Sequence, residues 1–527
     1  MRYVLVLLLL PALASAEPAA DLVLRSGDVL TQDAARPHAQ AIAVRGARVV
    51  AVGDDADVAA FIGPHTRVVE LRGRAVVPAL TDAHAHLMDL GLALTEVDLR
   101  GCTAPDDCAQ RLSPARGDWI RGRGWDQNRF AVPEFPTHTA LDRVAGDRAV
   151  VLERVDGHAL WLNAVAMRRA GITRATPDPA GGKIVRDGAG EPTGVFVDRA
   201  MELVTRAEPA PTTAMMEAAI LRAQDVAVAA GLTEIHEMGL PLAALDVYRQ
   251  LGQARRLKLR VYAFGSLEAA ETLLAHAPAP SSPDAYFTLR GIKLYADGAL
   301  GSRGAALLAP YSDDPSNRGL TLTPPAKLQE LARRALSGGW QVAVHAIGDR
   351  GNRDVLDAYA QAGVGAAQRF RIEHAQVVAL ADFPRFAKLG VIASMQPTHA
   401  VSDHGWAEAR LGPARLAGAY AWRRMLNAGV HVAFGSDFPV EDVSVVAGLR
   451  AAVERANWTV AEKLTRDEAL AAFTTGAAYA AFEDGWRGRA AVGQAADLTV
   501  LDAPAAGLLH AAIAMTIVGG RVVYERR

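Results

Sequence analysis

Cysteine is scarce in this chain, and basic residues do not cluster. Only two of its 527 residues are cysteines, Cys102 and Cys108 in GCTAPDDC, and no second cysteine or histidine pair lies near them. This scarcity argues against a cysteine-based zinc site. The 56 basic and 58 acidic residues nearly cancel, which leaves a net charge of −2, and no long basic run occurs. We therefore expect no nucleic-acid partner.

Long apolar runs are also missing after the first residues. The chain begins MRYVLVLLLLPALASA, with a basic residue at Arg2, a short apolar run and small residues up to Ala16. This pattern is typical of a secretory signal peptide at residues 1–16, and the run is too short to cross a bilayer. We predict an exported protein, periplasmic or secreted, with no membrane association after signal removal. In such a protein Cys102 and Cys108 can form a disulfide, and the alternative is two free thiols on a loop.

Both ends of the remaining chain contain short strand-like segments. DLVLRSGDVLT, AIAVRGARVVAVG and TRVVELRGRAVVPAL lie near the amino terminus, and ADLTVLDA and MTIVGGRVVYE lie near the carboxyl terminus. Their alternation of apolar and polar residues and their β-branched content favour strands. We predict one small β domain that combines residues 17–77 with residues 486–527.

The middle of the chain alternates between strand-like and helix-like segments. Eight segments resemble strands that end in polar residues: VVPALTDAHAH, GLTEIHEMG, LKLRVYAFG, LRGIKLYADGALG, WQVAVHAIGD, QRFRIEHAQ, GVIASMQPTH and GVHVAFGSDFP. Helical patterns such as MMEAAILRAQDVAVAAG and PAKLQELARRALSGG lie between them. Eight such units predict an α/β fold, a (β/α)₈ barrel formed by residues 78–99 and 212–485. Its active site is expected at the carboxyl ends of the strands.

Residues 100–211 interrupt this alternation after the first strand. They contain GWDQNRF, VDGHALWLN and PTGVFVDRAMELV. Their aromatic and glycine content predicts a folded insertion over the barrel mouth and not a linker. We expect this insertion to supply substrate specificity.

Chemically versatile side chains gather at the predicted carboxyl ends of the strands. In a strand, residues i and i+2 face the same side, so His84 and His86 point one way at the end of the first strand. Four further strand ends carry Lys293, His345, His374 and Asp437. Imidazole and carboxylate suit zinc and other borderline divalent metals, so the set predicts a metal site at one rim of the barrel.

Each of these residues also has an ordinary structural explanation. A single HxH pair is a weak signal, Lys293 can pair with a nearby carboxylate, and His345 and His374 can be hydrogen-bonded core residues. Asp437, in GSD, can be a turn or helix-cap residue. Their shared position at successive strand ends, in barrel order, favours the metal site over separate structural roles.

Several motifs resemble those of the amidohydrolase superfamily. They are TDAHAH, IKLYADGALGSRGAAL, VAVHAIGD, RIEHAQ, AFGSDFPV and the terminal GQAADLTVLD. With GWDQNRF and VDGHALWLN, they resemble more narrowly the amidohydrolase-3 or YtcJ-like branch, which includes N-substituted formamide deformylases. The resemblance covers nearly the whole chain after the signal peptide and is more specific for the superfamily than for a substrate.

The resemblance implies a metal-dependent hydrolase on a (β/α)₈ barrel with a β-sandwich beside it. It implies one or two divalent ions, by preference zinc, with His84, His86, His345 and His374 as ligands and Asp437 as ligand and proton shuttle. Lys293 stands where many members carry a carboxylated lysine that bridges two metals. Deaminase-like members usually lack that lysine and carry a glutamate after the fifth strand, where this chain has Asp349, which disfavours deamination.

The predicted reaction is hydrolysis of a non-peptide C–N bond in a small amide, an N-substituted formamide or a cyclic amide. Zinc lowers the pKa of bound water from 15.7 to about 7, and a general acid–base group such as Asp437 moves the proton to the departing nitrogen. Two alternatives stay open. The same metal site can act on an ester, lactone or phosphoester, or the protein can bind a metal or ligand without turnover.

Six residues are candidates for a substrate pocket: Trp125, Asp126, His158 and Trp161 in the insertion, and His236 and Asp297 in the barrel. The two tryptophans can equally be core residues of the insertion. A structural role is as plausible for His236, and Asp297 can position the loop after the fourth strand. The expected partner is a small-molecule substrate, and homo-oligomerisation stays open.

Overall fold

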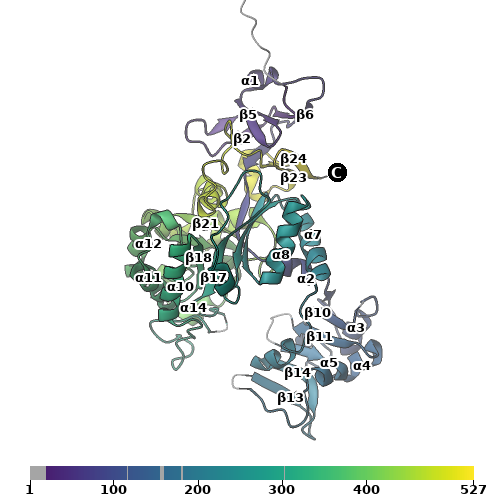
Figure 1. Ribbon diagram of the computed structural model, residues 1–527. Coiled ribbons are helices and arrows are strands. Elements are labelled where there is room, and N and C mark those ends of the chain that lie inside the picture. Colours follow the sequence, from purple (N-terminus) through teal and green to yellow (C-terminus); the bar gives the residue numbers. More distant parts are fainter. Residues whose placement is uncertain (1–18, 116, 155–158, 180–181, 302, 527) are drawn as a thin grey trace, which may run out of the picture. The chain divides into compact units, whose positions relative to one another are not determined.

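The computed structural model describes residues 19–115, 117–154, 159–179, 182–301 and 303–526 (Figure 1). The predicted signal peptide and His158 lie outside this set. The chain forms two compact units, one of residues Met88–Ala219 and the other of the segments before and after them. Among the described residues, no helix combines the length and the apolar character needed to cross a membrane.

A sheet of eight parallel strands forms the centre of the larger unit. The strands follow one another in chain order: β8 (Thr81–Ala85), β15 (Glu234–Leu240), β16 (Arg260–Gly265), β17 (Phe287–Tyr295), β18 (Gln341–Ala346), β19 (Arg371–His374), β20 (Ile392–Met395) and β21 (Val432–Phe434). The backbone N–H of Asp437 donates to the His84 carbonyl (2.8 Å), and that of His86 donates to the Phe438 carbonyl (2.9 Å). These bonds bring the two edge strands together, as in a (β/α)₈ barrel, and all eight predicted strands are present.

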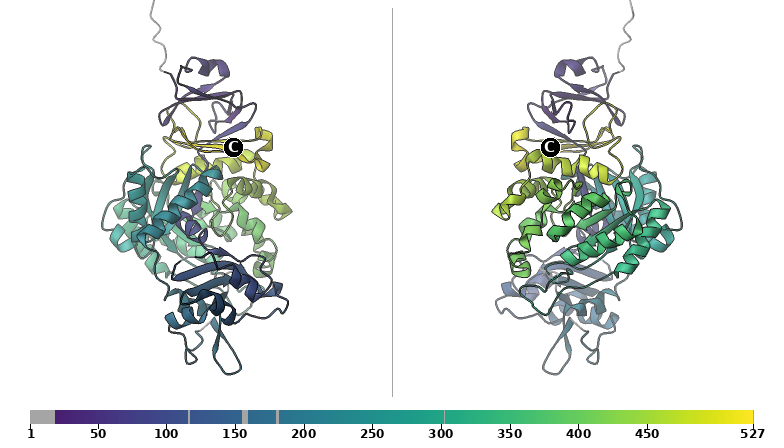
Figure 2. Two further views of the ribbon diagram at one scale, coloured as in Figure 1. Left: turned by 90° about the vertical axis from the view of Figure 1, so that its right-hand side faces the viewer. Right: turned by 90° about the vertical axis from the view of Figure 1, so that its left-hand side faces the viewer.

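Helices lie on the outer side of this sheet (Figure 2). They include α7 (Thr213–Ala229), α8 (Leu242–Gln253), α10 (Pro325–Gly338), α11 (Asp349–Ala362), α12 (Phe383–Leu389), α16 (Val445–Glu454), α17 (Arg466–Phe473) and α18 (Thr475–Ala480). Helix α10 begins at Pro325, where a missing N–H breaks no bond, and ends before Gly339, whose φ is +76°. It buries Leu328, Leu331, Ala332 and Ala335, which share one helical face. The helices predicted from the two quoted patterns are therefore confirmed at α7 and α10.

The segment VVPALTDAHAH divides between two sheets. Ala75–Pro78 forms β7, which pairs with strands from both chain ends, whereas the barrel strand β8 begins only at Thr81. Between them Ala79 has a φ of +50°, so the backbone turns there. The first barrel strand is therefore shorter than the predicted segment.

Two further sheets in the larger unit contain the strands near the chain ends. One has the order β5 (Arg48–Gly53), β4 (Ala41–Arg45), β1 (Leu22–Arg25), β6 (Arg67–Glu70). The other has the order β24 (Arg521–Glu525), β23 (Ile513–Val518), β22 (Leu498–Leu501), β7, β2 (Asp28–Leu30), β3 (His38–Ala39). Leu24, Ile42, Val76 and Leu498, from both sheets, belong to one buried apolar cluster. Strands from both ends of the chain thus share one core.

The smaller unit has its own six-stranded sheet and its own core. The sheet has the order β13 (Gly182–Arg186), β14 (Pro192–Asp198), β12 (Ala159–Leu162), β11 (Ala149–Arg154), β10 (Trp119–Trp125), β9 (Val97–Asp98), with helices α3 (Pro105–Gln110), α4 (Thr139–Ala145) and α5 (Ala164–Arg169). A disulfide joins Cys102 to Cys108, whose Cα atoms are 5.3 Å apart. Of the two alternatives for these cysteines, the structure has the disulfide. The predicted insertion, residues 100–211, falls inside this unit.

Candidate metal centre

The six predicted ligands lie together at the carboxyl ends of the barrel strands. They come from β8 and the residue after it (His84, His86), from β17 (Lys293), β18 (His345) and the end of β19 (His374), and from the segment after β21 (Asp437). Parallel strands place their carboxyl ends at one rim, which is why residues far apart in the sequence meet here.

His84, His86 and Asp437 form the tightest group. Asp437 Oδ1 lies 3.2 Å from His86 Nε2 and 3.5 Å from His84 Nε2. One donor atom from each of the three residues lies within 4.8 Å of the other two. Ligands bound at about 2.0–2.1 Å in a tetrahedral arrangement are about 3.3 Å apart, so these distances suit donors that share one ion.

Lys293 joins this group from the barrel interior. Its Nζ lies 3.2 Å from His84 Nε2, and the whole side chain is buried. Burial lowers the pKa of Lys293 to about 8, although the carboxylates of Glu373 and Asp437 act in the opposite direction. The amine is therefore more easily deprotonated than an ordinary lysine.

His345 and His374 extend the array of imidazoles. The ring centres of His374 and His84 are 4.7 Å apart, and those of His345 and His374 are 4.5 Å apart. His345 Nε2 lies 3.5 Å from the Gly298 carbonyl oxygen, which assigns the ring proton to Nε2. The four histidines thus form a continuous series of neighbouring rings.

Burial keeps most of these imidazoles neutral. It lowers the pKa of His345 to about 4 and places the pKa values of His84 and His374 well below their usual range. Burial would lower the pKa of His86, but the hydrogen bond to Asp437 and the charge of that carboxylate together raise it. Burial alone would raise the pKa of Asp437, but His84 and His86 hold it well below its usual range. Neutral imidazole and ionised carboxylate are the forms that bind metals.

Two buried side chains that the sequence interpretation missed orient these rings. Glu373 Oε2 accepts a hydrogen bond from His84 Nδ1 (2.6 Å), and Gln396 Oε1 accepts one from His374 Nδ1 (2.9 Å). Each bond assigns the proton to Nδ1 and leaves Nε2 with a lone pair for a metal. Partners of this kind are usual for metal-binding histidines, so the donor set and its supports fit a divalent ion.

Comparisons with known proteins agree with this geometry. The sequence profile described as Amidohydrolase family matches residues 67–524. The chain belongs to the amidohydrolase family. A solved structure of an uncharacterized metal-dependent hydrolase from Pyrococcus furiosus resembles this amidohydrolase with a TM-score of 0.80 and 29% identity, over 92% of this chain and 99% of that one.

Three curated relatives are similar over most of their length. Protein LONG AFTER FAR-RED 3 of Arabidopsis thaliana is 34% identical over 96% of this chain and 92% of its own. Putative amidohydrolase YtcJ of Bacillus subtilis is 33% identical over 88% and 91%. N-substituted formamide deformylase of Arthrobacter pascens is 28% identical over 96% and 98%. The resemblance to the YtcJ-like branch is thereby confirmed.

The pocket candidates in the smaller unit of this amidohydrolase have structural partners. Trp125 and Trp161 are fully buried in the core of that unit, with ring centres 5.9 Å apart. Their indole N–H groups donate to the carbonyls of Leu152 (2.9 Å) and Thr137 (3.1 Å). Core packing therefore accounts for both tryptophans, which is the alternative that the sequence left open. Asp126 forms an ion pair with Arg154 at 3.0 Å, and the prediction for His158 falls outside the described residues.

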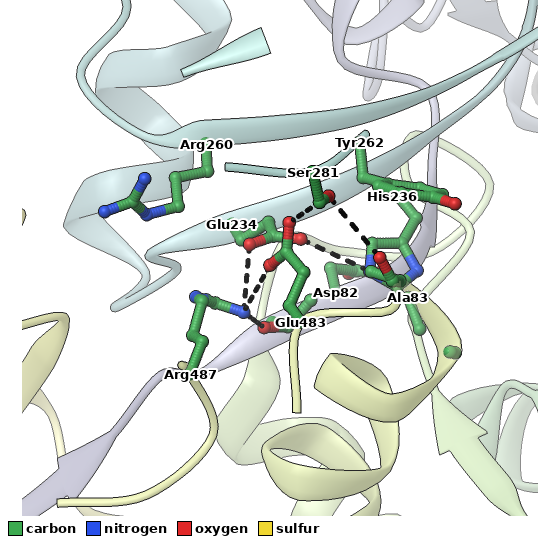
Figure 3. Close-up of polar contacts among 12 residues, drawn as sticks. Asp82, Ala83, Glu234, His236, Arg260, Tyr262, Ser281, Glu483 and Arg487 are labelled. Atoms are coloured by element: carbon green, nitrogen blue, oxygen red, sulfur yellow. Dashed lines mark hydrogen bonds and ion pairs between the residues drawn. The ribbon is translucent and has the colours of Figure 1, made fainter. Parts of the chain in front are cut away.

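Asp297 and His236 are buried. Asp297 accepts hydrogen bonds from the backbone N–H groups of Ala306 (2.8 Å), Ile347 (2.9 Å) and Gly348 (2.8 Å) and so holds the loops after β17 and β18 together. Burial raises the pKa of Asp297 to about 7. His236 accepts a hydrogen bond from Arg371 (2.8 Å), and Figure 3 shows its ring pointing toward the Glu234 carboxylate, 3.4 Å away. Both residues thus support the barrel.

Positive backbone φ angles mark two of the ligand positions. The values are +69° at His374 and +64° at Asp437. Such conformations cost energy for residues other than glycine and occur where the surroundings impose them, often at functional sites. Asp82 helps to impose the turn at Asp437, because it accepts hydrogen bonds from the Ser436 backbone (2.9 Å) and hydroxyl (2.6 Å).

His399 is a further residue that sequence reasoning missed. It lies in α13 (Pro397–Ser402), directly after β20, and its Nε2 is 3.7 Å from Asp437 Oδ2. Its ring faces that of His374, with 6.1 Å between the ring centres. The signal was present, since GVIASMQPTH had been recognised as the seventh strand and His399 is the last residue of that segment.

Proposed function

We propose that this amidohydrolase is an exported enzyme that hydrolyses a non-peptide C–N bond in a small amide, an N-substituted formamide or a cyclic amide. The observation that carries the proposal is the position of Asp437. Its Oδ1 faces His84 and His86, and its Oδ2 faces His399. A carboxylate in this position can accept a proton on one side and release it on the other.

His84, His86, His345, His374 and Asp437 are the residues that would hold one or two divalent ions. Zinc is the favoured metal, because imidazole and carboxylate are among its ordinary ligands. The chemistry that such an ion supplies when bound is Lewis acidity toward water and toward a carbonyl oxygen. The lowered pKa of Asp437 keeps its carboxylate ionised, the form that binds a metal.

Lys293 is proposed to be carboxylated and to act as a shared ligand of two ions. Addition of carbon dioxide to its neutral amine forms the carbamate and releases one proton. The support is its position, since Nζ lies 3.2 Å from His84 Nε2 at the centre of the ligand set. A single ion bound by the histidines and Asp437, with an unmodified Lys293, is the simpler alternative.

The choice of bond is supported by the name of one relative, N-substituted formamide deformylase, with 28% identity over 96% of this chain. A panel of formamides, cyclic amides, esters, lactones and phosphoesters, assayed with one zinc-loaded preparation, tests it. We expect turnover of at least one amide class that exceeds turnover of the matched ester. Preference for the ester would favour the same site acting on C–O bonds, and binding without any product would favour a non-catalytic protein.

Export is proposed from the signal-peptide pattern at residues 1–16. The disulfide between Cys102 and Cys108 agrees with it, because disulfides persist in oxidising compartments. Intact-mass analysis of the protein from a periplasmic or culture fraction is expected to give a chain that begins at Glu17. A full-length chain confined to the cytoplasm would contradict the proposal.

The two sheets at the chain ends are proposed to be the faces of one β-sandwich. The support is the single apolar cluster to which both contribute, including Leu24 and Ile42 from one sheet and Val76 and Leu498 from the other. Packing of two sheets over a shared apolar layer is the usual construction of a sandwich.

A further inference from the structure

A buried arginine crosses the interior of the barrel. Arg371 is the first residue of β19, and its side chain is fully buried. Its guanidinium donates to acceptors on four strands: the Ala83 carbonyl on β8 (2.6 Å), His236 Nδ1 on β15 (2.8 Å), the Glu373 carboxylate on β19 (2.7 and 3.0 Å) and the Ser394 hydroxyl on β20 (2.8 Å). Because β8 and β15 do not lie next to β19 in the order of the sheet, the guanidinium must lie inside the barrel.

Two of these acceptors connect Arg371 to His84 of the metal centre. Glu373 is two positions after Arg371, so the two side chains face the same side of β19. The guanidinium binds both oxygens of the Glu373 carboxylate and thereby sets the plane of that group. The same carboxylate accepts the Nδ1–H of His84 at 2.6 Å, and Ala83 directly precedes His84 in the chain. Arg371 therefore fixes both the partner of the His84 ring and the backbone before it.

His236 in turn orients the guanidinium. A guanidinium has N–H donors and no acceptor, so His236 Nδ1 must accept the hydrogen bond from Arg371, and the ring proton lies on Nε2. Nε2 lies 3.4 Å from the Glu234 carboxylate, toward which the ring points (Figure 3). Burial lowers the pKa of His236, which keeps the ring neutral and able to accept. The ring is thus held between Glu234 and Arg371.

Arg260 shows the contacts of a structural arginine in the same barrel. It is also the first residue of a strand, β16, and it is also buried. It donates to the Asp497 carboxylate (2.8 Å) and to the carbonyls of Pro283 and Ala285 (2.7 and 3.0 Å). These partners tie the barrel to the segment before β22, whereas the partners of Arg371 include the carboxylate that binds the His84 ring.

We propose that Arg371 and His236 are positioning residues of the metal centre. His236 directs the guanidinium, the guanidinium fixes Glu373 and the Ala83 carbonyl, and these two groups hold His84 with Nε2 toward the ion. The proposal deepens the proposed function, on whose metal site it rests, because it makes the affinity for the ion depend on residues that do not touch it.

Metal binding by the full chain tests the proposal without an assay of turnover. Zinc affinity is measured by competition with a chelator, and cobalt(II) absorption reports the geometry of the ligands. Arg371→Lys keeps the charge but loses the planar fork, so zinc affinity is expected to fall about 10- to 100-fold and the cobalt spectrum to change. His236→Leu removes the acceptor and is expected to cost about tenfold, the lower end of that range. His236→Asn, whose amide oxygen can replace Nδ1 as the acceptor, is expected to restore most of this loss.

Arg260→Lys is the matched control, expected to lower the unfolding temperature and to leave zinc affinity and the cobalt spectrum unchanged. If Arg371 acts through Glu373, the combined Arg371→Lys and Glu373→Gln variant should lose clearly less than the product of the two single losses. Unchanged zinc affinity in both Arg371→Lys and His236→Leu would overturn the proposal, as would equal losses in Arg371→Lys and Arg260→Lys. If Arg371→Lys does not fold, an unchanged affinity in His236→Leu is sufficient to overturn it. A wild-type protein that binds neither ion would instead refute the metal site, and failure of the whole substrate panel would refute only the proposed reaction.

Discussion

Two buried polar clusters lie at opposite ends of the same barrel strands, and they are built differently. The rim cluster, at the carboxyl ends, consists of His84, His86, Lys293, His345, His374 and Asp437. The base cluster, at the amino ends, consists of Glu234, Arg260, Arg487 and Asp497. Glu234 and Arg260 are the first residues of β15 and β16, and Figure 3 shows Glu234 facing Arg487.

Within these four residues of the base cluster, each charge meets an opposite charge. Arg487 lies 2.9 Å from both Glu234 and Asp497, and Arg260 lies 2.8 Å from Asp497. All four side chains are buried. Because Asp497 directly precedes β22, these ion pairs connect the barrel strands to the sheet formed by the chain ends.

In the rim cluster, groups of the same kind meet one another. Four imidazoles and an amine surround one carboxylate, and burial holds the pKa values of three of the imidazoles below their usual range. Such an arrangement can offer lone pairs to a metal ion. The contrast teaches that buried charged residues alone do not indicate an active site. Several buried bases that lie around a single point do indicate one.

The largest effect is expected from Lys293→Ala in the rim cluster. If Lys293 carries a carbamate that two ions share, its loss removes a ligand from both, and metal content and activity should fall together. Bicarbonate with a short carboxylic acid is expected to restore part of each. Metal analysis and turnover on one sample check this, and full activity in the variant would rule out the shared-ligand role.

Asp497→Asn is expected to break the base cluster. It leaves Arg260 and Arg487 without part of their counter-charge, and breaking a buried pair costs about 3–5 kcal/mol of unfolding free energy. Although burial opposes the shift, the two arginines lower the pKa of Asp497 in the folded protein. Its stabilisation is therefore present above the unfolded pKa of about 3.9 and is lost as the pH falls through the folded pKa.

Urea unfolding at several pH values measures this effect, and Asp502→Asn is the control. Asp502 pairs with Arg526 at 2.7 Å on the surface, so its loss should cost less than about 1 kcal/mol. Equal losses of unfolding free energy in the two variants would show that the buried pair stabilises the fold no more than an ordinary surface pair does.

Glu373 lies between the two clusters, and Glu373→Gln should have a smaller effect than the two substitutions above. Glu373 receives hydrogen bonds from Arg371 (2.7 and 3.0 Å) and accepts the Nδ1–H of His84. The amide keeps the shape but weakens the orientation of the imidazole, so zinc affinity is expected to fall about 10- to 100-fold. Competition with a chelator measures it, and an unchanged affinity would show that His84 needs no such support.

The sequence alone was sufficient to predict the barrel and the residues of the rim cluster. Most barrel strands are apolar runs with polar residues at or soon after their carboxyl ends, and this pattern can be read without knowledge of tertiary contacts. The ligands were found because they occupy corresponding positions at those ends. The first strand was misjudged because the left-handed backbone at Ala79 gives no signal in the sequence. The seventh predicted segment also ran too far, because its last residues begin helix α13.

The supporting residues could not be found in the same way. Side chains alternate along a strand, so Glu373 and His374 are expected on opposite faces. They serve one site because His374, with a φ of +69°, turns away from that alternation. For Trp125 and Trp161, aromatic content alone cannot separate a pocket from a core, and the packing of the smaller unit was needed to decide.

The central claim is that Asp437 moves the proton while the surrounding histidines hold the metal. Asp437→Asn keeps the size of the side chain and removes its ability to carry a proton. The account predicts a folded protein that retains at least part of its zinc and loses turnover by roughly 10²–10⁴-fold, the usual contribution of a general acid–base group. Zinc content and kcat measured on the same sample decide the matter, because near-native kcat with zinc in place would contradict the role assigned to Asp437.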